Sequence, residues 1–590
     1  MNKSEFEVLS QIIKTNKHPY TQRDISKQTI ISLGNINRII NKLKEKSFID
    51  NMYNITLNGI KVMSQYKVDN AVIMAAGMST RFAPLSYEMP KALLKVKGEI
   101  LIEREIKQLQ ESGINDITVI VGYMKEKMYY LADKFNVNIV VNEDYYRYNN
   151  PSSLIMVLDK LKNTYICSSD NYFTENVFEP YVYRSYYSAV YADGKTDEYC
   201  LSTTNDGLIK NVTIGGQDSW YMLGHVYFDH AFSKKFVDIL KSSYDQPGTK
   251  EQLWENLYMK NINQLPLYIR KYDSTMIKEF DSLDELRCFD DHYIDNADSN
   301  IFKNIQSVIS CKDQDITNIV PIKTGLTNTS FKFSCNGKDY VYRHPGVGTE
   351  QYINRKSEAA SMKIAKSLGL DNTFIYMDSH NGWKISHFVN NAKTLDYHNK
   401  AQVSNAINMI RILHTSNLST SFHFDPWKQI DKFLKILATS GRANFEGMNE
   451  IQHNMNIIRQ DVKRDNVSEC LCHCDCYNPN FLIAENNEMY LIDWEYSGMA
   501  DPAVDIGTFI ACSDYSTDKA KKIITQYLAH KPAETELRHY LAYVAILSYY
   551  WFIWALYQDS VGKPVGEWQY LWFKYTKLYS KEAIEMYHTK

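Results

Sequence analysis

The stretch AAGMSTRFAPL at residues 75–85, with PKALL at 90–94 behind it, decides how the central part of this 590-residue chain folds. It follows an apolar run that is typical of a buried strand. Glycine at position 77 lets the backbone approach phosphate oxygens closely, and the amides of its loop can hold them. Arg81 and Lys91 would add positive charge where a triphosphate develops charge during attack on its α-phosphorus. The stretch therefore predicts a nucleotide site at the end of a strand.

Strands and helices alternate along the chain after this loop. Such alternation predicts a wrapped, mostly parallel sheet with ligands at the carboxyl ends of its strands. We expect strands at 71–75, 117–121, 137–141 and 165–167, and helices at 100–112 and 125–135.

A second motif for phosphate chemistry begins at His473, where HCDCYNPN has the spacing H-x-D-x-x-x-x-N and is followed by LIDWEY at 491–496. In phosphoryl transfer, an Asp near the acceptor hydroxyl orients it and takes its proton. An Asn five residues later and an Asp on the next strand can hold Mg²⁺ against the phosphates. Asp475, Asn480 and Asp493 fit these three roles. Turn signals at Thr324-Gly325 and Asn336-Gly337 predict a strand-turn-strand segment between Ile319 and Arg343, and the chain beyond is mainly helical.

The composition is that of a globular protein of several domains. Hydrophobic residues make up 44% and charged residues 23%, and a net charge of −3 gives no support for non-specific binding of nucleic acid by the whole chain. The N-terminus has acids and no apolar core, so it is not a secretory signal. Ten cysteines are too sparse for a disulfide scaffold, which favours a reducing cytoplasm.

Two local patterns have a structural and a functional interpretation. Cys470, Cys472, Cys474 and Cys476 alternate, whereas zinc sites usually space cysteines as C-x₂₋₄-C, so we expect apolar packing rather than a metal site. The uncharged run at 540–557 is close to the length of a membrane span. Its Tyr and Trp are spread along the whole run rather than at the two ends, which favours a buried helix.

Residues 1–67 read as a small helical unit. Helices are expected at 4–14, from Thr21 in a start like a capping box, and at 32–46, followed by a hairpin and a closing helix. This pattern resembles a winged helix-turn-helix domain, whose third helix would present Asn35, Arg38 and Lys42 outward. The alternative is a docking or dimerisation module that never meets DNA.

Residues 68–290 resemble the sugar-phosphate and choline-phosphate nucleotidyltransferases, and within them the bacterial CTP:phosphocholine cytidylyltransferases. The resemblance rests on the loop at 75–85, on PKALL, and on Ser169-Asp170-Asn171-Tyr172. It implies in-line attack of a phosphomonoester on CTP, with release of pyrophosphate. The implied residues are nucleotide contacts at Ala75, Ala76, Gly77, Arg81, Lys91 and Ser169, Mg²⁺ ligands at Asp170 and Glu255, and an aromatic box at Tyr199 and Tyr227. Packing in the core is the alternative for each of the two tyrosines.

The region from Ile316 onward resembles the choline/ethanolamine kinase and aminoglycoside phosphotransferase superfamily, which has a protein-kinase-like fold. It carries the second motif and Asp505-Ile506-Gly507 after it. The implied residues are nucleotide contacts at Asn328 and Arg343, with Glu358 orienting Arg343, and a choline box of Glu495, Tyr496, Trp551 and Trp554. A cation that cannot donate hydrogen bonds is held by aromatic faces with an acid near the rim. A core aromatic stripe is the alternative.

We therefore expect a multidomain chain: a winged-helix-like unit at 1–67, a Rossmann-like α/β cytidylyltransferase at 68–298, and an α+β kinase-like domain at 299–590. The kinase would make phosphocholine from choline and ATP, and the first site would convert it to CDP-choline with CTP and Mg²⁺. The expected partners are these small molecules. Nucleic acid is a less favoured partner, through residues 1–67 alone. Open alternatives are ethanolamine or another amino alcohol, a sugar-1-phosphate nucleotidyltransferase joined to a small-molecule kinase, and a DNA-binding metabolite sensor.

Overall fold

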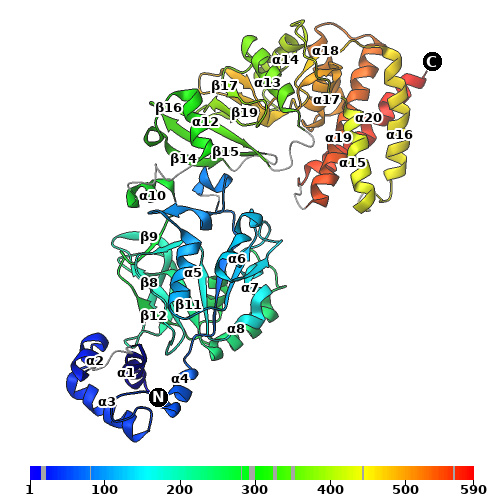
Figure 1. Ribbon diagram of the computed structural model, residues 1–590. Coiled ribbons are helices and arrows are strands. Elements are labelled where there is room, and N and C mark those ends of the chain that lie inside the picture. Colours follow the sequence, from blue (N-terminus) through cyan, green and yellow to red (C-terminus); the bar gives the residue numbers. More distant parts are fainter. Residues whose placement is uncertain are drawn as a thin grey trace. The chain divides into compact units, whose positions relative to one another are not determined.

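The structure of the protein is a computed structural model (Figure 1). It describes residues 1–14, 21–79, 82–280, 282–290, 299–322, 328–346, 353–440, 444–561 and 565–589. The chain divides into two compact units, Met1–Phe302 and Lys303–Lys590. Arg81, the predicted triphosphate contact, lies outside the described residues, and so does the Thr324-Gly325 turn.

The first unit begins with a bundle of short helices. Thr21 caps the second helix, because its side chain accepts the Asp24 amide while the Asp24 carboxylate accepts the Thr21 amide at 3.0 Å. An isolated bridge between Ile49 and Ile55 closes a tight hairpin before the fourth helix. The helices are α1 (Lys3–Lys14), α2 (Gln22–Thr29), α3 (Leu33–Glu45) and α4 (Leu57–Ser64).

These helices contact the α/β part of the same unit through ion pairs of Glu179. Its carboxylate lies 2.9 Å from the Lys14 ammonium at the end of α1 and 3.0 Å from the Arg270 guanidinium of the sheet. Beside this ion pair, the rings of Phe6, Tyr66 and Tyr183 pack together with centroids 5.1 to 5.7 Å apart.

The α/β part is built on a sheet with nine strands in the described chain, in the order β10-β9-β11-β6-β1-β4-β5, with β8 paired to β11 and β12 paired to β8 (Figure 1). The strands β6, β1, β4 and β5 are parallel, the pairings of β11 with β6, β9 and β8 and of β9 with β10 are antiparallel, and β12 is parallel to β8. The strands are β1 (Asn70–Ala75), β4 (Ile117–Val121), β5 (Asn138–Val141), β6 (Thr164–Ser168), β8 (Tyr186–Tyr191), β9 (Lys195–Thr203), β10 (Ile209–Gln217), β11 (Trp220–Phe228) and β12 (Tyr268–Lys271).

Both faces of the sheet are covered, because successive side chains of a strand point to opposite faces. Ala71 and Ile73 of β1 pack in one cluster with Ile106 of α5, whereas Val72 packs in another with Phe236 of α8. The other helices and strands are β2 (Lys95–Val96), β3 (Glu99–Ile100), α5 (Leu101–Glu111), α6 (Tyr130–Phe135), α7 (Pro151–Leu154), β7 (Asn171–Phe173), α8 (His230–Ser243), α9 (Trp254–Lys260), β13 (Ile277–Glu279) and α10 (Leu283–Phe289), and the division between the units falls within α12 (Asn300–Ile309).

The second unit opens with an antiparallel sheet in the order β14-β15-β16-β18-β17 and one helix, α13. The hairpin β15–β16 turns at Asn336 and Gly337, whose φ angles of 50° and 73° are those of the tight two-residue turn that Asn-Gly predicts. The elements are β14 (Thr317–Ile322), β15 (Asn328–Cys335), β16 (Lys338–Pro345), α13 (Arg355–Ser367), β17 (Phe374–Met377) and β18 (Lys384–His387).

A helical region completes this unit, with three short strand pairs around the second motif. Its elements are β19 (Lys393–Thr394), α14 (Lys400–His414), α15 (Pro426–Ser440), α16 (Met448–Asp461), β20 (Cys470–Cys472), β21 (Phe481–Ile483), β22 (Met489–Leu491), β23 (Gly498–Ala500), α17 (Ala503–Ala511), α18 (Thr517–Leu528), α19 (Glu534–Ser560) and α20 (Trp568–His588).

Helix α19 is long and apolar enough to cross a membrane by length and composition alone, yet 89% of its most apolar window is buried inside this unit. It packs against α17 at Gly507, where a β-carbon would lie 2.8 Å from the carbonyl oxygen of Tyr543. The run at 540–557 is therefore a core helix of the helical region, as its distribution of aromatic residues predicts.

Candidate active sites

The first site gathers at one edge of the parallel sheet. Met74 of β1 is in register with Ser168 of β6, so the loops after both strands lie side by side. Across this edge, the Lys91 ammonium contacts the Asp170 carboxylate at 3.0 Å, and its side chain is only 7% exposed. The structure thus brings the phosphate loop, Lys91, Ser169 and Asp170 together, as the sequence predicts.

The loop at Gly77 leaves room for an anion. Among the described residues, a β-carbon built on Gly77 would meet nothing within 4 Å, whereas one built on Gly122 would lie 2.8 Å from the Ala76 carbonyl oxygen. That carbonyl accepts the amide of Tyr123 at 3.0 Å. The loop therefore rests on a closely packed floor while its outer side is open, with Ala75 and Ala76 buried beneath.

Glu255 does not fit the metal-ligand role that the sequence suggests for it. Its carboxyl accepts a hydrogen bond from the Tyr187 hydroxyl at 3.0 Å and meets the Asn150 amide at 3.5 Å. Burial raises its pKa to about 7. Each of its two carboxyl oxygens already takes one of these hydrogen bonds, and we therefore assign Glu255 a different role.

The surroundings of Glu255 suit an organic cation better than Mg²⁺. Its charge raises the pKa of half-buried Tyr199, after burial itself, so the two side chains are near neighbours. Tyr187 stacks on Trp254 with centroids 5.9 Å apart and planes 8° from parallel. An acid among aromatic faces is the arrangement that holds a quaternary ammonium group.

Tyr227, the second predicted member of this box, is 0% exposed. Its ring packs on Tyr165 and Tyr186, with centroids 5.3 and 6.1 Å away. It lies in β11, where alternate side chains point into the sheet core, so it takes the packing role instead.

Two acids near Asp170 escape sequence reasoning. Glu279 of β13 pairs directly with Asn171, the residue after Asp170. Glu105 of α5 is 1% exposed, and burial, followed by the charge of Asp170, raises its pKa well above the usual range. Neither belongs to a motif: Glu279 is on a strand of three residues, and Glu105 stands among the helical acids of α5.

The second site is organised around the predicted Asp475 and Asn480. The Asn480 side-chain amide donates to both the backbone carbonyl and the carboxylate of Asp475, each at 2.9 Å. Burial raises the pKa of Asp475 well above its usual range, and the nearby charges of Asp493 and Glu495 add to this. A carboxylate held in this way is a stronger proton acceptor than an exposed one.

His473 and Asp505 hold the backbone of this loop. The Nε2–H of His473 donates to the Ile492 carbonyl at 2.9 Å, and its Nδ1 accepts the Asp475 amide at 3.2 Å, so the ring is neutral. Asp505 accepts the amides of His473 and Cys474 at 2.9 and 2.6 Å. His414 holds Asp505 in turn at 2.9 Å, and this role of His414 on α14 carries no motif in the sequence.

A cluster of buried charges faces this loop from the five-stranded sheet. Arg343 lies 2.5 Å from Glu358 and 3.4 Å from Asp493. Burial opposes ionisation of Glu358, yet Arg343 and Lys384 outweigh it and lower the pKa of Glu358 to about 2. Two cations that the sequence did not suggest complete the cluster: Arg355, 3.0 Å from Glu358, and Lys384, 3.6 Å from Glu358 and 3.8 Å from Asp493.

Glu495 lies where this cluster meets the aromatic residues. Its carboxylate accepts the Asn328 amide at 2.9 Å and lies 3.8 Å from Arg343. Burial and the charge of Asp493 raise its pKa to about 7. The structure therefore joins the predicted Asn328, Arg343, Glu358, Asp493 and Glu495 in one network.

The predicted aromatic residues of the second unit also meet. Trp551 contacts Tyr496 and Trp554 edge-on, with centroids 6.1 and 5.5 Å apart. Trp572 of α20 adds a third indole at 6.0 Å, which the sequence did not suggest. Tyr550, next to Trp551, lies close enough to Asp475 and Glu495 for their charges to raise its pKa further after burial. The aromatic cluster therefore adjoins the catalytic loop.

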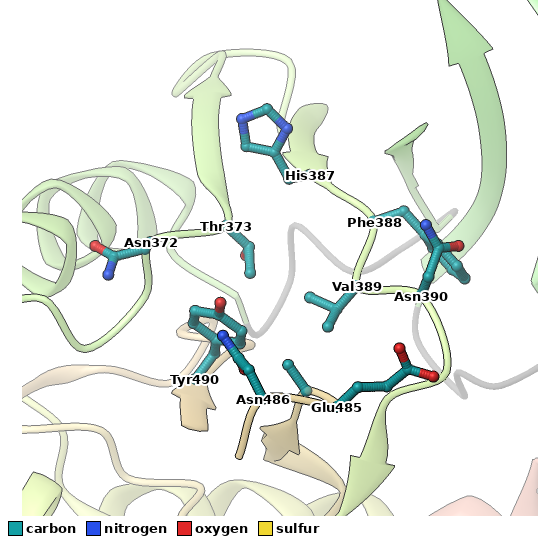
Figure 2. A pocket seen from close by; sticks show the side chains of 10 residues that line it. Asn372, Thr373, His387, Phe388, Val389, Asn390, Glu485, Asn486 and Tyr490 are labelled. Atoms are coloured by element: carbon teal, nitrogen blue, oxygen red, sulfur yellow. The ribbon is translucent and has the colours of Figure 1, made fainter. Parts of the chain in front are cut away.

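A separate hollow of about 500 Å³ lies beside the segment that follows β18. Figure 2 shows its lining, with His387 and Val389 on one side and Asn486 and Tyr490 of the β21–β22 hairpin on the other. It contains none of the predicted site residues.

A phosphate loop with Lys91 on a parallel sheet, and an H-x-D loop facing Arg343 beneath an antiparallel sheet, define two classes of enzyme. They are a nucleotidyltransferase and a protein-kinase-like phosphotransferase, joined in one chain, and the family matches confirm the predicted fold class for both domains. Comparisons with known proteins identify the families. Residues 71–192 match the family of MobA-like NTP transferase domains, and residues 319–577 match the choline/ethanolamine kinase family.

Individual relatives and a solved structure are similar to parts of this chain. The choline-phosphate cytidylyltransferase of Streptococcus pneumoniae is 35% identical over 217 residues, which are 37% of this chain and 95% of the relative. The 2-aminoethylphosphonate cytidylyltransferase of Lancefieldella rimae is 34% identical over 229 residues, 38% of this chain and 93% of the relative. The crystal structure of a choline kinase from Streptococcus pneumoniae matches 49% of this chain and 98% of its own, with 21% identity and a TM-score of 0.39. The chain belongs to the choline-phosphate cytidylyltransferase family and carries a kinase domain of the choline/ethanolamine type.

Proposed function

We propose that this chain makes CDP-choline in two steps. The second unit transfers the γ-phosphate of ATP to choline, and the first unit joins the resulting phosphocholine to CMP from CTP, releasing pyrophosphate. The observation that carries this proposal is the pairing of the two families in one chain, since the product of the kinase is the substrate of the cytidylyltransferase.

In the kinase step, Asp475 accepts the proton of the choline hydroxyl, while Arg343 contacts the phosphates and Glu358 keeps its guanidinium in place. The aromatic faces of Trp551, Trp554 and Tyr496 enclose the trimethylammonium group. Because these side chains and Asp475 adjoin each other, the hydroxyl at the far end of choline reaches the loop.

In the cytidylyl step, Lys91 stabilises negative charge at the α-phosphate, and the amides of the Gly77 loop hold the triphosphate. Tyr199 and Glu255 hold the choline head group. Both reactions use in-line displacement, so positioning and charge neutralisation carry the catalysis and no covalent enzyme intermediate is needed.

Mg²⁺ is the metal that both donor sets fit. It favours carboxylate and other oxygen ligands together with substrate phosphates. Asp170, with Glu279 nearby, would hold it in the first unit, and Asn480 with Asp493 in the second. The ion would neutralise phosphate charge there. Asp170 and Asp493 already form ion pairs, with Lys91 and Arg343 respectively, so each carboxylate lies next to a positive charge.

The test uses the purified full-length protein with choline, ATP, CTP and Mg²⁺, and product analysis by mass. We expect CDP-choline. Asp475→Asn should abolish its formation from choline but not from added phosphocholine, and Lys91→Met should let phosphocholine accumulate. Turnover of choline by Asp475→Asn would refute the assignment of the loop. Competition between choline and ethanolamine in the kinase step identifies its preferred alcohol. Replacing phosphocholine with 2-aminoethylphosphonate in the cytidylyl step identifies the preferred head group there.

For residues 1–67 we propose a winged-helix-like unit, for which duplex DNA is the less favoured partner and a docking or dimerisation role is the alternative. This segment has eleven Lys and Arg against five Asp and Glu, whereas the whole chain has a net charge of −3. Arg38 and Lys42 are exposed on the outer face of α3. Binding of a labelled duplex that weakens with salt, and weakens further in Arg38→Gln, would support DNA binding; no binding at 50 mM salt would refute it.

We place both reactions in the cytoplasm, which supplies ATP and CTP.

A further inference from the structure

Two cysteines and a histidine meet behind the catalytic loop of the second unit. The ligand atoms of His414, Cys470 and Cys472 lie within 4.8 Å of one another. Within the described part of the chain, these three residues form a group that could hold a metal ion. The sulfurs of Cys470 and Cys472 are 3.7 Å apart. Two thiolates on a tetrahedral zinc ion, each with a bond of about 2.3 Å, are separated by about 3.8 Å. The pair is therefore already at the spacing of a zinc edge.

The hydrogen bonds of His414 match those of a metal ligand. Its Nε2 pairs with the Asp505 carboxylate at 2.9 Å, which leaves the lone pair on Nδ1, where the Tyr527 hydroxyl sits at 2.7 Å. Histidines that bind metals usually donate their other N–H to a carboxylate in this way.

The backbone explains why only two of the four alternating cysteines take part. Strand β20 ends at Cys472, and Cys474 has a φ of 67°, which breaks the alternation. Cys474 and Cys476 instead lie around Asp505. Helix α14 supplies, through His414, the third ligand that the C-x-C spacing lacks.

We propose that His414, Cys470 and Cys472 form a zinc site, with Tyr527 or a water molecule in the fourth position. Binding replaces the two S–H bonds by Zn–S bonds and releases two protons to solvent, so affinity rises with pH. The thiols then give up the weak hydrogen bonds from Cys472 to the carbonyls of Ala500 and Asp501, each 3.6 Å long. The ion ties α14 to the strand that runs directly into His473.

The experiment titrates the metal-free, reduced full-length protein with Co²⁺, then displaces it with Zn²⁺. Thiolate ligands give an intense near-ultraviolet charge-transfer band, which the oxygen ligands of the two Mg²⁺ sites do not give. We expect one Co²⁺ per chain with this band, its loss on adding one equivalent of Zn²⁺, and a higher thermal midpoint with Zn²⁺.

Cys470→Ser and Cys472→Ser should each weaken binding at least about 100-fold, because loss of even an outer partner of a ligand costs 10- to 100-fold. The matched control is Cys288→Ser, which removes an exposed thiol of the first unit and should leave the titration unchanged. Absence of the charge-transfer band in the parent protein, or its persistence in Cys470→Ser, would overturn the proposal.

Discussion

Single side chains in the kinase-like unit are held in place by their partners' charges. Arg343 is 4% exposed and serves Glu358 and Asp493 at once, while Glu358 is fully buried. Removing one partner of a buried ion pair leaves the other charge buried without a counter-charge, which lowers the free energy of unfolding by about 3–5 kcal/mol. Lys384 and Arg355 remain next to Glu358, so the lower end of that range applies here.

We predict that Arg343→Met lowers kcat/KM for ATP at least about 100-fold and unfolds the kinase unit about 3 kcal/mol more easily. Coupled-assay kinetics and urea unfolding measure the two effects. Lys332→Met is the control, because it removes a cation of the same sheet that pairs with Asp339 at 2.7 Å near the surface. Equal losses in both variants would contradict the role of Arg343.

The pKa of Glu495, about 7, predicts how choline phosphorylation depends on pH. The ionised carboxylate attracts the choline cation and the protonated form does not. We therefore expect kcat/KM for choline to rise from pH 6 to pH 8 with an apparent pKa near 7. In Glu495→Gln, the rise near pH 7 should disappear and the value at pH 8 should fall about 10-fold or more. An unchanged profile in the variant would assign the titration to another group.

The sequence predicted the residues of both sites where a motif ties them to one loop. Lys91, Asp170, Asp475 and Asn480 lie where their spacing indicates. Glu255 and Tyr227 were misassigned because burial and strand orientation depend on the sheet. Arg355, Lys384 and His414 went unnoticed because none belongs to a motif: Arg355 lies three residues before Glu358, and the partners of Lys384 and His414 are distant in the sequence.

At the scale of elements, the helices and strands with strong periodicity match the prediction, whereas the short ones do not. The strand Ile117–Val121 has the predicted bounds, and the start of α2 has the predicted capping box. Strands β17 and β18 were missed because four residues carry little pattern. The segment 125–135 is a 3₁₀ turn followed by α6 rather than one helix, and α12, whose Ile301 and Ile305 are buried, lies just after the expected domain boundary at 298.

The contact of α17 with α19 depends on Gly507. Replacement by alanine would push a methyl group onto the Tyr543 carbonyl, so we predict that Gly507→Ala destabilises the second unit by about 1–3 kcal/mol. Gly34→Ala in α3 is the control: nothing lies within 4 Å of its added carbon, and alanine favours a helix by up to about 1 kcal/mol. Thermal unfolding of both variants measures the difference. A neutral Gly507→Ala would show that the helices separate easily.

At the scale of the whole molecule, each site is built within one unit. We therefore predict that a mixture of the Asp475→Asn and Lys91→Met proteins makes CDP-choline from choline, after a lag in which phosphocholine accumulates in solution. Time-resolved product analysis shows the lag. A mixture that stays inactive would mean that phosphocholine passes only within one chain.

The first unit should lose stability in mild acid because of His225. Burial, and then the charge of Arg270, lower its pKa to about 3, whereas the unfolded chain titrates near 6.5. The unfolded state thus binds the proton first, so stability present above pH 6.5 is lost as the pH falls towards 3, at about 1.4 kcal/mol per pH unit. His225→Gln should flatten this slope between pH 6 and pH 5, where most carboxylates remain ionised. Equal slopes in both proteins would argue against it.

The charge cluster around Glu358 has a consequence for selectivity in the cell. Three cations gathered without acids would attract any abundant small anion, inorganic phosphate included. Because Glu358, Asp493 and Glu495 already pair with Arg343, Arg355 and Lys384, the cluster offers such anions little net attraction. The proposed nucleotide would bind here by making enough contacts to displace several of these acids together, which a small competing anion would not.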